Sequence, residues 1–275
     1  MTVNEIYQSG LKLLENNNIE NSKFEAQSLL QKAFSLDRVG FIIHKTDKAD
    51  ENCSHNFLKF IEKRISGEPL QYILGEWSFM GFDFKVGRGV HIPRHDTEVV
   101  VNLCIDFLEN RTDKKTVDLC SGSGAIAVAL DKISGAEVTA VEIDETAFSY
   151  LETNVKENNS SVKPVMADAL KICETFADGG LDLIVSNPPY IKSADIETLQ
   201  KEVQLEPRLA LDGGEDGCDF YREIVNRWSR KLKKGGALAF ELGENQADAV
   251  KALMTDKDRK STRLNSSHIT ISYAV

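Results

Sequence analysis

The residues with the clearest chemical meaning are Asn187-Pro188-Pro189-Tyr190, which come soon after the apolar run Leu181–Val185. An amide or aniline-like nitrogen is a poor nucleophile because its lone pair is delocalised. The Asn187 side-chain oxygen and the Pro188 carbonyl could each accept one of its N–H bonds, which aims the lone pair and stabilises the developing positive charge. The two prolines stiffen this backbone, and Tyr190 offers a ring face for stacking. The pattern favours methyl transfer from a sulfonium to a planar nitrogen, although such proline pairs also occur in ordinary turns.

A second candidate site is the glycine-containing loop that ends the apolar run Thr116–Leu119. Glycines let the backbone pass close to a ligand, and the start of the following helix offers free N–H groups. The pattern G-x-G-x-x-A is satisfied here, so the loop fits NAD as well as S-adenosylmethionine, and a tight turn without a ligand stays open. The candidate cofactor contacts in this loop are Asp118, Cys120, Ser121, Gly122, Ser123 and Gly124.

Acidic residues follow the next two apolar runs. Glu142 lies about 20 residues beyond the loop, where an acidic side chain can accept hydrogen bonds from ribose hydroxyls. Asp168 could accept from an adenine amino group, with Ala169 against the ring, but a helix cap is an alternative role for Asp168. For Asp144 the cap is the preferred interpretation.

Short apolar runs alternate with helical stretches from Lys115 onwards, which predicts a parallel sheet with helices on both faces. In such sheets ligands bind at the carboxyl ends of the strands, where all of these candidates lie. Upstream, the apolar spacing is helical, and aromatic and β-branched residues around Gly81 then predict a β-hairpin. We therefore expect a helical domain at 1–74, a hairpin linker at 75–93, a catalytic domain at 94–257 and a separate tail at 258–275.

Composition narrows the classes of partner. The 275 residues carry a formal net charge of -10, which argues against general affinity for nucleic acid. The longest mostly apolar stretch, Val99–Leu108, is too short to cross a bilayer, and no leader sequence is visible, so we expect a cytoplasmic protein without a membrane partner. The five cysteines lie far apart, so no metal site is expected.

The chain resembles the glutamine N5-methyltransferases of bacterial peptide-chain release factors, the PrmC/HemK family, over roughly residues 1–250. The Asn-Pro-Pro-Tyr motif alone is shared with adenine- and cytosine-directed DNA enzymes, whereas the combination of blocks is more specific. The blocks that carry the resemblance are Gly67–Gly75, Phe79–Phe84, Ile92–Glu98, the glycine loop, Ser186–Ile191, Glu206-Pro207, Ala210-Leu211, Gly213-Gly214, Asp216-Gly217 and Tyr221-Arg222.

The resemblance implies a Rossmann-like fold that uses S-adenosyl-L-methionine and methylates the glutamine of the Gly-Gly-Gln loop in class-1 release factors. It implies that the helical domain helps to dock that protein. Carried over by position, the cofactor contacts fall on Cys120 to Gly124, Glu142, Ala169 and Asn187, and the substrate contacts on Asn187, Pro188, Pro189 and Tyr190.

Three features depart from the family pattern. His95 replaces a proline, and Cys120 replaces a frequent glycine. The tail 258–275 does not match the last two strands that the family has, so we expect it to pack poorly and to leave the edge of the fifth strand exposed.

Three alternatives remain at this level. An Asn-Pro-Pro-Tyr adenine N6-methyltransferase would need a basic, aromatic-rich surface for nucleic acid. An NAD-dependent dehydrogenase would explain the glycine loop and Glu142 but not Asn187 to Tyr190. A non-catalytic protein would bind a release factor without turnover.

Overall fold

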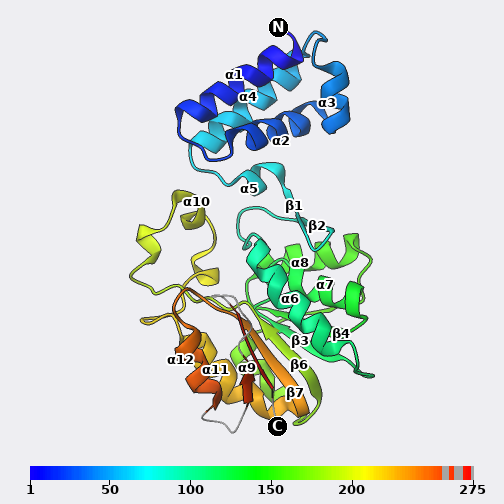
Figure 1. The fold of residues 1–275 in the computed structure, drawn as a ribbon, viewed down its shortest axis with the longest axis vertical. Coiled ribbons are helices and arrows are strands. Elements are labelled where there is room, and N and C mark those ends of the chain that lie inside the picture. The colour runs from blue at the N-terminus through cyan, green and yellow to red at the C-terminus, as the bar shows by residue number, and fades with distance from the viewer. Residues whose placement is uncertain (256–259, 263–268, 274–275) are drawn as a thin grey trace. The chain divides into compact units, whose positions relative to one another are not determined.

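The computed structural model describes residues 1–255, 260–262 and 269–273 (Figure 1). The chain divides into two compact units. One comprises Met1–Glu76 and Gln200–Leu205, and the other Trp77–Leu199 and Glu206–Val275. The first unit is helical, and the second contains the sheets.

The helical unit packs around apolar residues from its longer helices. Thr2 and Glu5 form a reciprocal capping box at the start of the first helix. Gly10 allows close packing there, because a Cβ at this position would lie 2.4 Å from the Phe57 ring. The helices of this unit are α1 (Val3–Asn16), α2 (Ser22–Phe34), α3 (Arg38–His44), α4 (Glu51–Ile65), α5 (Leu70–Leu74) and α10 (Lys201–Gln204).

A buried arginine joins α10 to the rest of the helical unit. Arg64 on α4 lies 2.5 Å from a carboxylate oxygen of Glu25 and 2.5 Å from one of Glu202. Burial raises the pKa of Glu25, while Arg64 acts in the opposite direction. Removing one partner from such a buried group is costly because the remaining charges stay desolvated. This ion-pair cluster accounts for the grouping of Gln200–Leu205, far along the chain, with the N-terminal helices.

A seven-stranded sheet forms the centre of the second unit. Its order is β5-β4-β3-β6-β7-β9-β8, and the first five strands are parallel. A separate two-stranded sheet pairs β1 (Glu76–Phe79) with β2 (Phe82–Lys85). The parallel strands are β3 (Lys115–Leu119), β4 (Glu137–Glu142), β5 (Lys163–Met166), β6 (Leu181–Ser186) and β7 (Leu232–Glu241).

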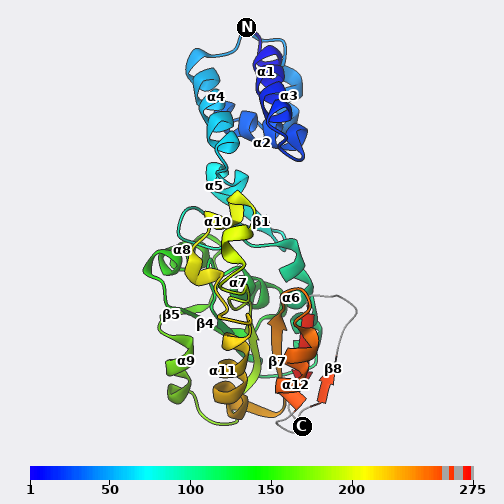
Figure 2. The same cartoon turned by 90° about the vertical axis from the view of Figure 1, so that its left-hand side faces the viewer.

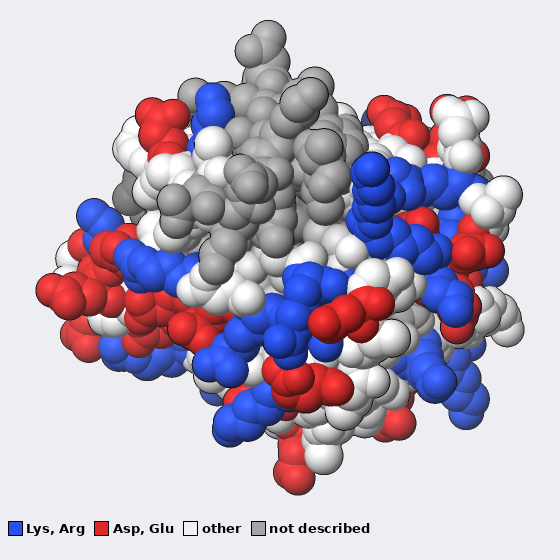
Figure 3. Space-filling model, turned by 90° about the horizontal axis from the view of Figure 1, so that it is seen from below, with Lys and Arg blue, Asp and Glu red and all other residues white. Residues whose placement is uncertain are grey.

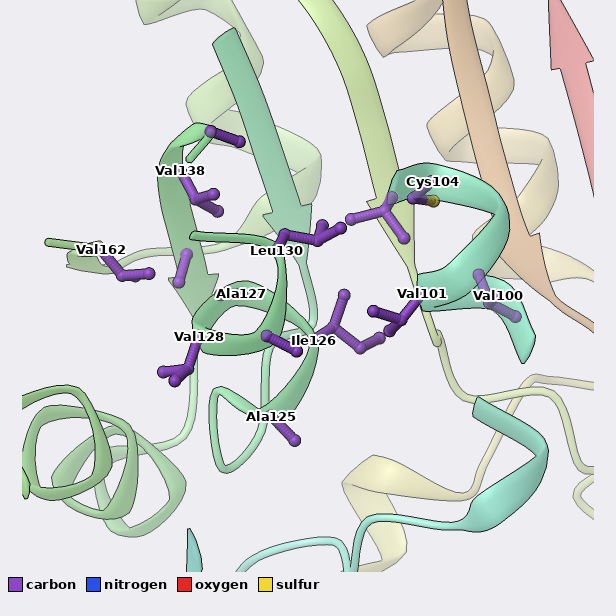
Figure 4. Packing of buried hydrophobic residues seen from close by; sticks show 14 of the residues in the cluster. Val100, Val101, Cys104, Ala125, Ile126, Ala127, Val128, Leu130, Val138 and Val162 are labelled. Atoms are coloured by element: carbon purple, nitrogen blue, oxygen red, sulfur yellow. The ribbon is translucent and has the colours of Figure 1, made fainter. Parts of the chain in front are cut away.

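Helices cover both faces of the parallel sheet (Figure 1 and Figure 2). Successive residues of β6 face opposite sides of the sheet, as the two-residue period of a strand requires: Leu183 and Val185 face one side and Ile184 faces the other. On the side of Leu183 and Val185, Val101 lies beside Ile126 (Figure 4). That side is covered by α6 (His95–Leu108), α7 (Ala125–Ser134) and α8 (Glu145–Glu157), and the side of Ile184 by α9 (Ala169–Ile172), α11 (Asp219–Trp228) and α12 (Ala247–Thr255).

The fifth parallel strand does not end the sheet, so the expectation of an exposed edge is wrong. β9 (Ile269–Tyr273) pairs antiparallel with β7, and β8 (Lys260–Thr262) pairs antiparallel with β9. The sequence Ile-Thr-Ile-Ser-Tyr is rich in β-branched residues, which favour extended backbone. On the side of β7 that faces away from β6, the backbone N–H and C=O groups need partners, and an extended segment supplies them. The poor packing expected of 258–275 lies, at 258–259, 263–268 and 274–275, outside the described residues.

The fold class predicted from the sequence is confirmed: a Rossmann-like α/β sheet, a helical N-terminal region and a small β-hairpin. Neither α3 nor α5 was anticipated, because each is shorter than two turns and leaves little periodic signal. Four short 3₁₀ helices complete the described elements: η1 (Cys173–Thr175), η2 (Ile196–Thr198), η3 (Arg208–Ala210) and η4 (Ser229–Lys231). No helix among the described residues combines the length and apolar character needed to span a bilayer.

Two lysines at the start of β7, Lys231 just before the strand and Lys233 within it, are part of a network of ion pairs. Lys233 lies 2.7 Å from Asp182 and 3.2 Å from Asp113, and Lys231 lies 2.7 Å from Asp178. On the face seen in Figure 3, Lys and Arg are interspersed with Asp and Glu rather than gathered into one patch. Paired charges of this kind leave little free positive potential for a phosphate backbone.

Candidate active site at the carboxyl ends of the parallel strands

The two sequence motifs meet where the strand order reverses. β3 lies between β4 and β6 in the sheet, and Leu119 pairs with Ser186 at the carboxyl ends of β3 and β6. Cys120 and Asn187 are therefore the first residues after two neighbouring strands. A crevice outside such a reversal point is the usual ligand site of an open α/β sheet.

In the glycine loop between β3 and α7, every second residue from 120 to 124 has a positive φ angle. The φ angles are +60° at Cys120, +53° at Gly122 and +81° at Gly124. A Cβ at Gly124 would lie 2.4 Å from Leu151 Cδ1, whereas one at Gly122 would have no neighbour within 4 Å. Gly124 is thus needed for packing, and Gly122 leaves open space where a ligand can approach the backbone.

Cys120 occupies the left-handed region at a cost, because an L-residue there is less stable by about 1 kcal/mol than glycine. We expect Cys120→Gly to be more stable than Cys120→Ala by about 1 kcal/mol, since both lose the thiol and only alanine keeps the strain. Urea unfolding of the two variants measures this difference. Equal stabilities would mean that the loop relaxes and that no strain is stored at position 120.

Glu142, at the end of β4, holds the glycine loop. One carboxylate oxygen accepts from the Gly122 N–H at 2.8 Å, and the other accepts from the Ile143 and Asp144 N–H groups at 2.8 and 2.9 Å. A carboxylate offers about four acceptor positions, so three backbone bonds leave capacity for a ligand hydroxyl. The side chain is both a structural clamp and a candidate ribose acceptor.

Asp118, the fourth residue of β3, is fully buried, and neither of its carboxyl oxygens has a hydrogen-bond partner among the described residues. Burial raises the pKa of Asp118 to about 8; the nearby Ser121 side chain and the Ala127 backbone act in the opposite direction, and the negative charge of Glu142 acts with burial. An unpaired buried carboxyl is costly unless a ligand or a proton compensates it. A proton supplies this compensation at neutral pH, and a nearby cationic ligand would favour the ionised carboxylate instead.

The raised pKa of Asp118 predicts a pH-dependent stability. The folded carboxyl keeps its proton up to about pH 8, whereas the unfolded one loses it near 3.8. Between these values folding takes up a proton, so the free energy of unfolding falls as pH rises, by up to about 1.4 kcal/mol per pH unit. Asp118→Asn has no titrating carboxyl at this position. Without cofactor, its free energy of unfolding should therefore rise relative to that of the wild type as pH increases from 5 to 8. Parallel stability profiles of the two proteins would contradict a protonated Asp118.

Asp144 and Asp168 both cap helices. Asp144 accepts from the Thr146 and Ala147 N–H groups at 2.9 Å each, so its expected role is confirmed. Asp168 accepts from the Leu170 N–H at 2.8 Å and pairs with Lys171 at 3.0 Å. Burial opposes these contacts, but on balance the pKa of Asp168 is lowered.

Ala169 is the first residue of α9, and Trp228 of α11 holds it in place. The Trp228 indole N–H donates to the Ala169 carbonyl at 2.8 Å, and the Trp228 ring packs 5.0 Å from the Phe176 ring. The Ala167 N–H donates to the Glu142 carbonyl at 2.8 Å. Ala169 and Glu142 are thereby held at neighbouring strand ends, as a shared cofactor contact requires.

The Asn-Pro-Pro-Tyr segment leaves β6 with trans peptide bonds and two buried prolines. The Asn187 side chain is half-buried, and it makes no hydrogen bond within the part of the chain that the structure describes. The Tyr190 hydroxyl lies 3.3 Å from Glu241 Oε1. Burial, followed by the Glu241 charge, raises the pKa of Tyr190, so its phenol is protonated and donates this bond.

Glycines downstream allow close packing on this segment. A Cβ at Gly213 would lie 2.7 Å from the Tyr190 Cα, and one at Gly217 would lie 2.4 Å from the Tyr190 carbonyl oxygen. The Gln246 amide donates to the carbonyls of Tyr190, at 2.9 Å, and Gly217, at 3.1 Å. The glycine-rich block therefore supports the backbone of the candidate catalytic segment.

The segment Ile92–Glu98 is connected to three distant parts of this unit. Arg94 donates to the buried Glu206, Thr97 donates to Glu241, and the Glu98 carboxylate accepts from the Met80 N–H at 3.0 Å. Burial alone would raise the pKa of Glu206, but the nearby His91 and Arg94 lower it on balance.

Several of these supporting residues were missed in the sequence. Thr97 and Glu206 lie inside sequence blocks that carry the family resemblance, but the sequence suggested no role for either side chain. Glu241 is the last residue of β7 and Gln246 follows five residues later, in the sequence Glu-Leu-Gly-Glu-Asn-Gln; an acidic residue at a strand end was the available signal. His95, which replaces a proline, is the first residue of α6, a position that favours proline.

The structure brings most of the candidate residues together at the carboxyl ends of the parallel strands. Contacts join Gly122 to Glu142, and Ser121 donates to the Asp118 carbonyl at 2.9 Å. The pairing of β3 with β6 places Asn187 beside this cluster. Tyr190 instead contacts Glu241 at the end of β7.

Comparison with known proteins identifies both parts of the chain. Residues 5–75 match the family described as PrmC N-terminal domain, and residues 94–209 match the methyltransferase small domain. A release factor glutamine methyltransferase of Geobacter sulfurreducens is 42% identical over 84% of this chain and 81% of its own length. One of Clostridium acetobutylicum is 32% identical over 94% and 91%.

Solved structures agree on the fold. The hMettl16 catalytic domain in complex with MAT2A 3'UTR hairpin 6 aligns with a TM-score of 0.56, at 15% identity over 82% of each chain. A human methyltransferase 10 domain containing protein aligns with a TM-score of 0.50, at 15% identity over 71% of this chain and 89% of its own. With its S-adenosylmethionine-dependent methyltransferase fold and these close relatives, the chain belongs to the release factor glutamine methyltransferase family.

Proposed function

We propose that this enzyme transfers a methyl group from S-adenosyl-L-methionine to the side-chain amide nitrogen (N5) of the glutamine in the Gly-Gly-Gln loop of class-1 release factors. The observation that carries the proposal is the placement of Asn187 directly after β6 and beside the glycine loop that follows β3, with a side-chain amide that no described residue binds. The relatives with 32–42% identity are named for this activity.

The proposed cofactor contacts are Asp118, Cys120–Gly124, Glu142, Asp168, Ala169 and Asn187. The cofactor supplies a transferable methyl group on a positively charged sulfur. Beside such a cation, the buried Asp118 carboxyl would give up the proton that burial otherwise makes it keep, and the two charges would compensate each other. The remaining acceptor capacity of Glu142 fits the ribose hydroxyls.

The proposed catalytic residues act by holding the substrate amide. The Asn187 side-chain oxygen and the Pro188 carbonyl accept its two N–H bonds, which fixes the nitrogen and stabilises positive charge during transfer. Pro189 stiffens the segment, and Tyr190 packs against the planar amide while its hydroxyl stays bonded to Glu241.

For the other regions we propose that 1–74 docks the release factor, that 75–93 acts as the linker and that 94–257 performs the reaction. In the tail 258–275, β9 pairs with β7, and β8 pairs with β9 as the last strand of the sheet. Because the substrate is a translation protein, we place the enzyme in the cytoplasm, without a membrane or nucleic-acid partner.

A competition assay tests the choice of substrate. The purified enzyme is given labelled S-adenosylmethionine with equal amounts of a release factor and a DNA duplex that contains adenines. Label on the protein fraction alone is the expected result. Label on the DNA would instead support the adenine N6-methyltransferase alternative.

A further inference from the structure

Asn154, on α8, is a fully buried polar residue that connects two functional segments. Its side-chain oxygen accepts from the Lys85 N–H at 2.7 Å, and its amide nitrogen donates to the Lys85 carbonyl at 3.1 Å. The same nitrogen donates to the Ser123 carbonyl at 2.9 Å. One side chain therefore binds β2 of the hairpin and the glycine loop at once.

The three bonds use both donors and one acceptor of the Asn154 amide. Towards Lys85, the amide pairs with a backbone N–H and C=O as a neighbouring strand would. Towards the loop, it fixes the carbonyl side of the Ser123–Gly124 peptide, while the Gly124 N–H donates to the Ser121 carbonyl at 2.8 Å. That peptide is held from both of its sides, in the middle of the candidate cofactor loop.

The neighbouring contacts of α8 lack this double connection. The amide of Asn158, the C-cap of α8, donates to the Asp83 carbonyl of β2 and to the Asn154 backbone carbonyl, each at 3.0 Å, and Glu157 Oε2 lies 3.8 Å from Lys85 Nζ. Asn158 thus supports the hairpin without any bond to the glycine loop. Asn158 is therefore a matched control for Asn154: both side chains bind β2, but of the two only Asn154 bonds to the glycine loop among the described residues.

We propose that Asn154 is a positioning residue for S-adenosylmethionine, which holds the Ser123–Gly124 peptide in its binding conformation and makes cofactor affinity depend on β2. The proposal rests on the proposed role of the glycine loop. A buried network in which every member is paired is rigid. Without the Asn154 amide, the Ser123 carbonyl loses its buried donor and the peptide gains freedom to rotate.

The variants to compare are Asn154→Ala, Asn154→Asp and Asn158→Ala. Isothermal titration with S-adenosylmethionine should give a Kd raised about tenfold for Asn154→Ala, and by less than about twofold for Asn158→Ala. Asn154→Asp keeps the acceptor for Lys85 but cannot donate to Ser123 when ionised, so its Kd should rise at least as much. At saturating cofactor, kcat of Asn154→Ala should stay close to that of the wild type.

A purely structural role predicts a different result. If Asn154→Ala lowers the unfolding temperature but leaves Kd unchanged, or if both alanine variants raise Kd equally, the proposal is overturned. A wild-type protein that does not bind S-adenosylmethionine would instead refute the proposed function of the loop.

Hydrogen exchange on the wild type gives a second test that needs no variant. The Lys85 N–H, bonded to Asn154, should exchange more slowly when S-adenosylhomocysteine is bound. Unchanged exchange of this amide with the ligand at saturation would contradict the coupling of β2 to the cofactor loop.

Discussion

Asn187→Ala is expected to lower the rate of methyl transfer at saturating substrates by on the order of a hundredfold or more. The alanine variant loses the side-chain acceptor that holds the substrate amide and stabilises its developing charge. Because the Asn187 side chain makes no hydrogen bond to described residues, its removal should cost little stability. Single-turnover kinetics with labelled cofactor measure the rate, and titration should show a much smaller change in cofactor affinity.

A variant that keeps an oxygen acceptor separates this role from a general disturbance of the loop. Asn187→Asp retains an acceptor in the same place, so it should be less impaired than Asn187→Ala. An unchanged rate in Asn187→Ala would remove Asn187 from the catalytic group. Equal loss in both variants, with a lowered unfolding temperature, would point to a structural role instead.

Glu142→Ala is expected to weaken S-adenosylmethionine binding by roughly a hundredfold, because hydrogen bonds to a buried charged group are among the strongest available to a ligand. Two effects combine in this variant. The ribose loses its proposed acceptor, and the Gly122 N–H loses the carboxylate that fixes the glycine loop at 2.8 Å. Calorimetric titration of the cofactor measures the change in Kd.

Asp144→Ala is the matched control for Glu142→Ala. Asp144 lies two residues further on and caps α8 through two backbone N–H groups. Loss of this cap should lower the free energy of unfolding by about 1 kcal/mol and leave the cofactor Kd nearly unchanged. If Glu142→Ala bound the cofactor as well as Asp144→Ala does, Glu142 would have no part in the ribose site.

The strands that position the site were largely predictable because they are buried on both faces. β6 is apolar at four of its six positions and every residue is buried, so the run was visible as a strand. The first half of β7 (Leu232–Glu241) is harder to recognise as a strand, because it contains Lys233 and Gly235-Gly236. The charge of Lys233 is compensated by its ion pair with Asp182, which is distant in the sequence.

The residues that support the site could not be found by local reasoning, because their partners are distant in sequence. Arg94 meets Glu206 across 112 positions, and Thr97 meets Glu241 across 144. The sequence pattern identified Asn187 and Glu142 because strand ends in an α/β sheet converge on one edge. It did not indicate that Tyr190 would be anchored to Glu241.

Two motif blocks of the family acquire a shared physical explanation from these contacts. Arg94 and Thr97 connect the start of α6 to Glu206 and Glu241, and the glycines at 213 and 217 pack on the backbone of Tyr190. The glycines therefore support the Tyr190 backbone directly, and Thr97 reaches the Tyr190 hydroxyl through their shared partner Glu241. Preorganised acceptors of this kind lower the barrier because they need no rearrangement during the reaction.

The most direct test of the central claim is methyl transfer from labelled S-adenosylmethionine to a purified class-1 release factor, compared with the same factor carrying Gly-Gly-Ala. The account predicts label on the wild-type factor alone, with the methyl group located by mass spectrometry on the glutamine side-chain nitrogen. Equal labelling of both factors, or labelling of neither while the cofactor still binds, would contradict it.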